Sequence, residues 1–393
     1  METKTKLPRL LSLDVLRGLT IASMITVNNP GDWGHMYAPL EHADWNGCTP
    51  TDLIFPFFLF MVGVAIWFAF KKFDHQVNRE ATKKILKRTF LIFLIGVLLN
   101  WFPFFRYLNA DESGGFGAML LKAIHNVRIP GVLQRIALAY GAGAFIGLWL
   151  KDYRKILAVI AFLLLGYWAI LAIDGSHNFY TPENNLVGRI DLAIFGENHI
   201  YTEHVNDKPI HFDPEGLLST IPAIATVLLG FLIGEFIDKA KSHKKLVVQL
   251  LVAGALMIGL GYLWDLTFPL NKKIWTSSYV IFTAGWATLL MGIFIYVIDV
   301  LGYKLWSHPF LVFGLNPLFI FVFAGVWGRL LLYIRWSNAA GEIVTLKTWL
   351  YQNVFESIGL QPINTSLLYS LVHIVFFWFI VWVMYRKKIF IKV

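Results

Sequence analysis

Long apolar runs, separated by short charged breaks, are the feature that most constrains how this chain can fold. About ten of them approach the roughly 20 residues that a helix needs to cross a bilayer. They lie near 12–29, 51–70, 86–105, 129–150, 155–173, 217–237, 246–264, 278–299, 309–333 and 365–385. Because lipid offers no hydrogen bonds to an open backbone, such runs fold as helices. The sequence therefore predicts an all-α, polytopic integral membrane bundle with about ten transmembrane helices.

The uneven distribution of basic residues between the breaks predicts the orientation in the membrane. Of the 34 lysines and arginines, 22 lie in alternate breaks that include both chain ends, 9 lie in the opposite breaks and 3 lie within apolar runs. Cytoplasmic loops of membrane proteins carry the excess of Lys and Arg. We therefore predict that both termini are cytoplasmic. The net charge of +9 reflects this bias and does not indicate nucleic-acid binding.

A single domain is the simplest organisation for residues 1–393. The sequence contains no internal repeat, no low-complexity tract and no soluble segment with a boundary of its own. Its one cysteine, Cys48, excludes an internal disulfide and a Cys-x-x-Cys metal motif. We predict one transmembrane domain without a metal site.

The stretch 28–63, NNPGDWGHMYAPLEHADWNGCTPTDLIFPFFLFMVG, is richer in chemistry than a connector between two membrane helices requires. It contains two histidines and four acids but no Lys or Arg, and the orientation above places it on the extracytoplasmic side. His42 lies between Glu41 and Asp44, and a carboxylate on one ring nitrogen makes the other nitrogen a better base. We predict His42 as the reactive group; the alternative is a loop histidine without a chemical role. His35 is the weaker candidate because its neighbours GHMY include no acid.

Asp52 is the predicted partner of His42. Thr49, Pro50 and Asp52 have the pattern of a helix capping box, which is sufficient by itself to explain the acid. The two roles are compatible, because an acid held in the first turn of a helix at the edge of the bilayer lies where His42 can reach it. Ionisable groups within membrane segments are functional candidates by default.

Three further side chains of the stretch are candidates for the same site. Asn28, at the end of the first apolar run, and Asn46 carry amides that can stabilise negative charge on a carbonyl oxygen. The alternative for Asn28 is a structural role, since Asn is common at helix C-termini. Cys48 is a weaker candidate as an acyl carrier, because no neighbouring Lys or Arg lowers the pKa of its thiol.

Basic residues gather at the predicted outer ends of two other helices. Arg128 precedes Pro130, which suits the first turn of a helix, so Arg135 lies one to two turns inside the run and must face a partner or a water-filled cavity. The second group consists of Lys272, Lys273 and Ser277. Together these residues are predicted to bind an anionic ligand that carries phosphates. The alternative is that their long side chains reach the membrane surface without binding a ligand.

Two local patterns predict features of the helices themselves. The segment 174–216 is too long for a turn, and its mixed apolar content predicts a short helix at the outer face. It ends in DPEG, where Asp213 and Pro214 have the pattern of a cap and first turn of the next helix. Pro317, directly after Asn316, predicts a kink in the ninth run.

Six blocks of sequence extend from the first apolar run to the ninth. They are RLLSLDVLRGLTIASMITVNN, HADWNGCTPTDLIFPFFLFMVG, RIPGVLQRIALAY, DPEGLLSTIPAIATVLLG, NKKIWTSSYV and FGLNPL. Together they resemble the bacterial relatives of heparan-α-glucosaminide N-acetyltransferase, a family of transmembrane acyltransferases. The second block is the most specific.

The resemblance implies transfer of acetyl from cytoplasmic acetyl-CoA, as co-substrate, to an amino sugar beyond the membrane. The family's active histidine falls on His42, its partner aspartate on Asp52 and an active-site asparagine on Asn28. The coenzyme phosphates would then be held by some of Arg128, Arg135, Lys272, Lys273 and Ser277. The resemblance also implies a multi-pass protein of the bacterial inner (cytoplasmic) membrane that forms a homodimer.

Two routes fit these residues. His42 acts as the general base that deprotonates a glucosamine-type sugar, or it carries the acetyl group transiently. Two alternative functions remain, an O-acyltransferase of an envelope glycan and a proton-coupled sugar transporter. Transporters commonly show repeats and paired broken helices at the membrane midplane, whereas the polar cluster here lies at the predicted outer edge.

Overall fold

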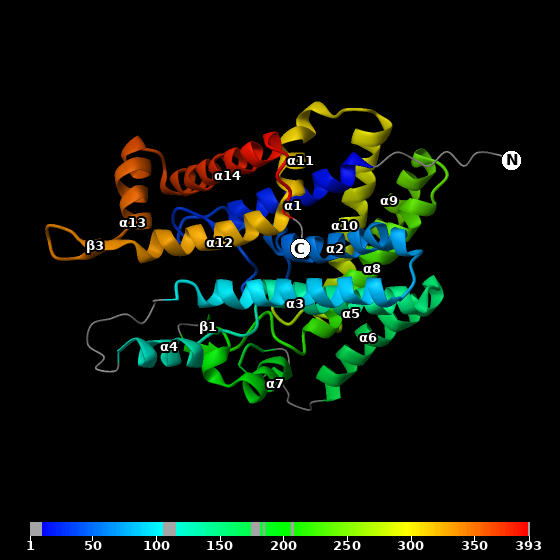
Figure 1. Ribbon diagram of the computed structural model, residues 1–393, viewed down its shortest axis with the longest axis horizontal. Coiled ribbons are helices and arrows are strands. Elements are labelled where there is room, and N and C mark those ends of the chain that lie inside the picture. The colour runs from blue at the N-terminus through cyan, green and yellow to red at the C-terminus, as the bar shows by residue number, and fades with distance from the viewer. Residues whose placement is uncertain (1–9, 105–114, 174–180, 184, 206–207, 392–393) are drawn as a thin grey trace.

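The computed structural model describes the chain apart from residues 1–9, 105–114, 174–180, 184, 206–207 and 392–393. Helices make up most of the described chain, which confirms the predicted all-α polytopic membrane class (Figure 1). The longer helices are α1 (Leu11–Asn28), α2 (Ile54–Phe70), α3 (Arg79–Trp101), α5 (Val132–Leu150), α6 (Tyr153–Ile173), α8 (Thr220–Lys239), α9 (His243–Asp265), α10 (Ser277–Phe294), α12 (Pro317–Tyr333) and α14 (Pro362–Arg386). The shorter elements are α4 (Gly115–His125), α7 (Leu186–Phe195), α11 (His308–Leu315), α13 (Leu346–Leu350) and the strands β1 (Thr202–Val205), β2 (Lys208–His211), β3 (Arg335–Ser337) and β4 (Ile343–Thr345).

Each predicted run corresponds to a helix or to a bent pair of helices. Within the described residues, seven helical segments are long and apolar enough to cross a membrane, or eight if α11 and α12 form one span. The remaining two runs are α1 and α3, which also carry charged side chains such as Asp14 and Arg88. The predicted total of ten spans therefore stays a prediction. The predicted kink at Pro317 is confirmed, since α11 and α12 meet at 74°.

Glycines allow the central helices α2 and α8 to approach with their backbones. A Cβ atom added to Gly63 of α2 would lie 2.0 Å from the carbonyl oxygen of Val227, and one added to Gly230 of α8 would lie 2.0 Å from that of Phe60. Small residues permit such close helix packing in membranes. The main hydrophobic core therefore forms around this pair, with α5 and α10 packed against it.

The polar connections gather where the helices end. Figure 1 shows α4, α13 and β3 toward the left of the view, where α3 and α12 end. Strands β1 and β2 form one antiparallel hairpin, and β3 and β4 form a second. The predicted short helix in 174–216 is confirmed as α7, but its hairpin was not predicted. The predicted cap at Asp213 is wrong: α8 begins at Thr220, and Asp213 bonds to Arg128 instead.

Candidate active site

His42 and Asp52 form the centre of the candidate site. After α1 the chain turns through a short 3-10 helix at Ala38–Leu40 and enters a second one at Pro50–Leu53, which leads directly into α2. His42 Nδ1 lies 2.7 Å from Asp52 Oδ1, so the two side chains meet as the sequence predicts. The predicted capping box at Thr49 and Asp52 is confirmed as well. One acid therefore starts the helix and binds the histidine.

The Asp52 carboxylate is buried and held by several donors. Its side chain is only 2% exposed. Oδ2 accepts hydrogen bonds from the backbone N–H groups of Ala43 at 3.0 Å and Thr49 at 3.1 Å, and from the Thr49 hydroxyl at 3.1 Å. A carboxylate only accepts hydrogen bonds, so the proton of the neutral His42 ring belongs on Nδ1. This leaves Nε2 as the basic nitrogen.

Lys272, which the sequence predicts to bind phosphate, lies against this pair. Its Nζ is 3.0 Å from His42 Nδ1 and 3.3 Å from Asp52 Oδ1. Burial lowers the pKa of the Lys272 ammonium, and the negative charge of Asp52 opposes that effect. Because His42 Nδ1 already donates to Asp52, the carboxylate is the group that holds the ammonium. Lys272 therefore contacts Oδ1 of Asp52, the oxygen that the capping box does not use.

The second histidine of the stretch, His35, also has an acid partner, which its neighbours GHMY did not indicate. His35 Nδ1 lies 2.6 Å from Asp32 Oδ2, three residues earlier and just outside the GHMY neighbourhood. The two pairs differ in the burial of the acid, because the side chain of Asp32 is 41% exposed and that of Asp52 is 2% exposed, whereas the two rings are similarly exposed at 53% for His35 and 44% for His42. His35 lines none of the cavities described below.

A cavity of about 170 Å³ lies against His42, and we call it the His42 cavity. Its polar lining consists of Thr20, Asn28, His42, Thr51, Glu215 and Lys272. The rest of the lining is apolar and includes Phe58 and Phe321. Asn28 is the last residue of α1. The cavity thus brings Asn28 and His42 together, as the sequence predicts.

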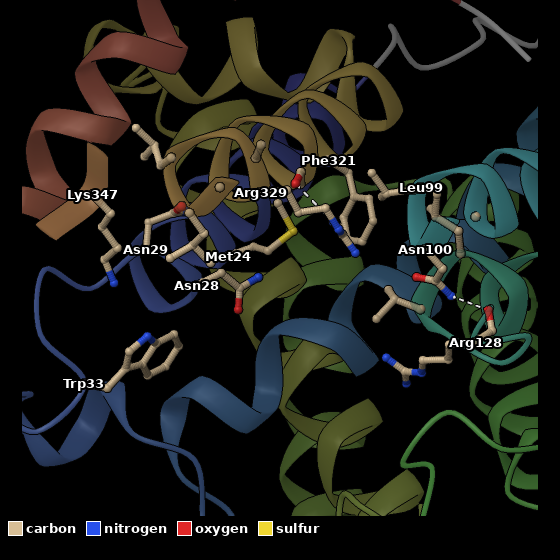
Figure 2. Close-up of a pocket in the computed structure, with 18 of the residues that line it drawn as sticks. Met24, Asn28, Asn29, Trp33, Leu99, Asn100, Arg128, Phe321, Arg329 and Lys347 are labelled. Atoms are coloured by element: carbon tan, nitrogen blue, oxygen red, sulfur yellow. Dashed lines mark hydrogen bonds between the residues drawn. The ribbon is translucent and has the colours of Figure 1, made fainter. Parts of the chain in front are cut away.

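A second cavity of about 380 Å³, the Trp33 cavity, shares Met24, Asn28, Val132 and Phe321 with the first. Figure 2 shows Lys347, Asn29 and Trp33 on one side of it and Asn100 and Arg128 on the other. Further polar lining comes from Asn28, Gln134 and Arg329, and the described residues that line this cavity include no acid. The Trp33 indole offers a flat face for stacking, and the amides and cations around it offer hydrogen bonds. The cavity therefore suits a ligand that contains a polar ring.

The third cavity, of about 530 Å³, lies among α1, α3, α5, α12 and the end of the chain, and we call it the Arg88 cavity. Its charged lining consists of Asp14, Arg17, Lys84 and Arg88. Arg17 pairs with Asp14 at 3.3 Å. Phe321 of α12 lines all three cavities, so its ring lies where they meet.

Arg128 is held by two acids of the DPEG block. Its Nε and Nη2 donate to both oxygens of Asp213 at 2.8 and 2.7 Å, and Nη2 also donates to Glu215 at 2.6 Å. Burial lowers the pKa of the Arg128 guanidinium, but the bonds to Asp213 and the charge of Glu215 outweigh this and raise it above its ordinary value. Arg128 is therefore a permanent cation that joins α5 to the segment before α8.

The other residues predicted to bind phosphates contact neighbours within the protein. Arg135 is buried and bonds to the Ser219 hydroxyl and the Gly216 carbonyl. Lys273 lies 3.4 Å from Glu203, and the buried Ser277 hydroxyl donates to the Leu164 carbonyl at 2.7 Å. None of Arg135, Lys273 and Ser277 lines the three cavities. Their contact with coenzyme A stays a prediction.

Asn46 and Cys48 lie beside the site without lining the His42 cavity. Asn46 Oδ1 accepts a hydrogen bond at 3.1 Å from the side-chain amide of Asn271, which directly precedes Lys272 in the sequence. This bond connects the loop of His42 to the loop of Lys272. Burial and the charge of Asp52 raise the pKa of the Cys48 thiol to about 12. Such a thiol is a poor nucleophile, which agrees with its ranking from the sequence.

A family model described as heparan-alpha-glucosaminide N-acetyltransferase, catalytic, matches residues 9–262, well over half of the chain. The chain belongs to this family. The heparan-alpha-glucosaminide N-acetyltransferases of Homo sapiens and Mus musculus are each 26% identical to it, over 446 and 372 aligned positions that cover 98% and 80% of the chain. The alignments cover only 60% of the human protein and 53% of the mouse protein.

Within this heparan-alpha-glucosaminide N-acetyltransferase family member, sequence reasoning missed four residues of the cavities: Trp33, Glu215, Arg329 and Lys347. Two of them carried a usable signal. Arg329 lies inside an apolar run, where a charge marks a functional candidate. Glu215 lies in the DPEG block, but it follows His42 by 215 − 42 = 173 positions, and no periodic pattern connects the two residues.

Proposed function

We propose that this protein is a transmembrane N-acetyltransferase that moves acetyl from cytoplasmic acetyl-CoA to the free amine of a glucosamine-type sugar on the extracytoplasmic side. One observation carries the proposal. The buried Asp52 orients His42 on a cavity that shares lining residues with two larger cavities, in a chain whose relatives are named for this reaction. Each of the larger cavities then serves one substrate. We place the enzyme in the bacterial inner membrane.

His42 is the general base of this reaction. An amine is an ammonium near neutral pH and lacks the lone pair that must attack the thioester. His42 Nε2 removes one proton, after which the nitrogen bonds to the acetyl carbon and the carbon–sulfur bond of acetyl-CoA breaks. The coenzyme thiolate takes up a proton, so the reaction releases one proton overall. Asn28, on the same cavity, donates its amide to the carbonyl oxygen as negative charge develops there.

The Arg88 cavity is the site we assign to the donor. Arg17, Lys84 and Arg88 bring three cations to it against the single acid Asp14, and phosphates bind where cations gather. It is lined by the beginnings of α1 and α3, the ends that the basic breaks predict to be cytoplasmic. The acyl arm then passes Phe321 to reach the His42 cavity. Lys272 acts on Asp52 rather than on a phosphate.

The Trp33 cavity is the site we assign to the sugar. An indole offers a face for a sugar ring, and the amides of Asn28 and Asn29 offer hydrogen bonds to its hydroxyls. Asn28 also lines the His42 cavity, so a sugar bound here can extend its amine toward His42. Both substrates therefore reach one small cavity from different directions.

A matched pair of histidine variants tests this function. The purified protein is incubated with acetyl-CoA and glucosamine, and N-acetylglucosamine is quantified. His42→Ala should lower kcat by about 100-fold or more, because a positioned general base contributes about that factor. His35→Ala removes a histidine from the same stretch that also pairs with an acid, and it should leave kcat within about twofold. Wild-type turnover in folded His42→Ala would reject the assignment.

A second experiment tests whether acetyl passes directly to the sugar or is first carried by His42. The enzyme is mixed with acetyl-labelled acetyl-CoA without a sugar, quenched within one turnover and digested. Direct transfer predicts no label on the protein. Label on a peptide that contains His42 would instead establish an acetyl-histidine intermediate.

A further inference from the structure

Glu215 is the acid of the described His42 cavity lining. It lies on the segment between β2 and α8, and its side chain is 14% exposed. Asp52 is nearer to His42, but it is buried behind the histidine and does not line the cavity. A substrate in the cavity therefore meets the carboxylate of Glu215 and not that of Asp52.

One oxygen of Glu215 is engaged and the other is not. Oε2 accepts a hydrogen bond from Arg128 Nη2 at 2.6 Å. Within the described part of the chain, no hydrogen bond reaches Oε1. The engaged oxygen fixes the orientation of the carboxylate, and Oε1 remains able to accept a hydrogen bond from a ligand.

Glu215 shares the guanidinium of Arg128 with Asp213. The fully buried Asp213 accepts two of the three hydrogen bonds that the Arg128 guanidinium donates within the described residues, and Glu215 accepts the third. Lys272, a cation of the same cavity lining, is held by Asp52 at 3.3 Å, and the buried Arg135 bonds to Ser219 and Gly216 rather than to Glu215. Glu215 is therefore the carboxylate of this cavity lining that can accept a hydrogen bond from an ammonium group.

We propose that Glu215 binds the ammonium of the acceptor sugar in the His42 cavity and thereby makes the enzyme prefer an amine over a hydroxyl. This inference rests on the proposed acetyl transfer. The ammonium donates one hydrogen bond to Glu215 Oε1 and turns a second N–H toward His42, which takes that proton. A sugar with a hydroxyl in place of the amine brings no charge, so it forms no ion pair with Glu215 and binds more weakly.

Glu215→Gln tests this assignment, because the amide keeps the shape of the side chain and removes its charge. The matched control is Glu203→Gln, which removes a paired acid of the same loop region that lines none of the three cavities. Steady-state kinetics are measured with glucosamine and with acetyl-CoA. We expect Glu215→Gln to raise KM for glucosamine by about tenfold or more, and to leave KM for acetyl-CoA within about twofold. Glu203→Gln should change neither value.

A second measurement uses glucose as a competitive inhibitor, since it has a hydroxyl where glucosamine has the amine. The wild type should bind glucosamine at least about tenfold more tightly than glucose, and Glu215→Gln should reduce this ratio to near one. Glu215→Asp keeps the charge and should retain most of the preference, and it carries the test if the Gln variant does not fold. An active wild type with unchanged KM for glucosamine in Glu215→Gln overturns this inference alone. A wild type that acetylates no amine overturns the proposed function.

Discussion

His35 and His42 show that burial, and not the presence of an acid, separates a positioned base from a surface contact. Each ring has a carboxylate within 2.7 Å. Asp32 is 41% exposed and screened by water, whereas Asp52 is 2% exposed and fixed by three further donors. Exposed pairs contribute little to stability or orientation. Only the buried Asp52 can hold its imidazole in one orientation during a reaction.

Two adjacent lysines offer a prediction at this scale. Lys272 holds Asp52 at 3.3 Å, whereas Lys273 lies 3.4 Å from Glu203, away from the His42 cavity. Lys272→Met should lower kcat for glucosamine acetylation by about tenfold or more, because removal of the cation leaves the buried Asp52 carboxylate with an uncompensated charge. Lys273→Met should stay within about twofold. Equal kcat values for both folded variants would show that Lys272 does not support the base.

The residues of the site could be predicted from sequence only where they are neighbours in the chain. His42, Asp52 and Asn28 lie in one stretch of sequence. There the capping pattern placed Asp52 at a helix start within reach of His42, and the end of the first apolar run placed Asn28 at a helix end. Lys272 and Glu215 could not be assigned their roles, because the Lys272–Asp52 contact spans 220 positions. A charge pattern shows that such a residue is costly to bury, but not which partner compensates it.

At the scale of elements, the contact between α2 and α8 is the most sensitive to side-chain size. Gly230→Ala should lower the stability of the purified protein by about 1–3 kcal/mol, because the new methyl group would meet the Phe60 carbonyl of α2. Gly166→Ala in α6 is the control, since a Cβ atom there meets nothing within 4 Å and alanine favours the helix. Thermal unfolding in detergent measures both. A Tm for Gly230→Ala at or above that of Gly166→Ala would contradict this packing.

The elements themselves were largely predictable, because span length and apolar content leave few alternatives in a bilayer. The kink at Pro317 followed from the missing amide proton of proline. The two short hairpins and the pairing of Asp213 with Arg128 were not predictable. Asp213 matches a cap pattern, yet the long-range bond to Arg128 outweighs it. Local capping contributes about 1 kcal/mol, whereas an unpaired buried guanidinium costs more.

At the scale of the whole molecule, the chemistry depends on two entrances to one small cavity. The Arg88 cavity lies at the beginnings of α1 and α3, whereas the Trp33 cavity lies where α1 and α3 end. Phe321 lies between them at the His42 cavity. A donor from one side and an acceptor from the other can meet at His42 only if these ends face opposite sides of the membrane.

This orientation can be measured with single cysteines. Cys48→Ala removes the native thiol, and Asp44→Cys and Lys241→Cys then place one exposed thiol each in the His42 loop and in the break between α8 and α9. In intact cells, a membrane-impermeant maleimide should label Asp44→Cys, whereas Lys241→Cys should react only after permeabilisation, because the break at Lys241 belongs to the basic set. Labelling of Lys241→Cys in intact cells, with Asp44→Cys protected, would reverse the orientation. Cytoplasmic acetyl-CoA would then have to enter through the Trp33 cavity, which contradicts the assignment of the donor to the Arg88 cavity.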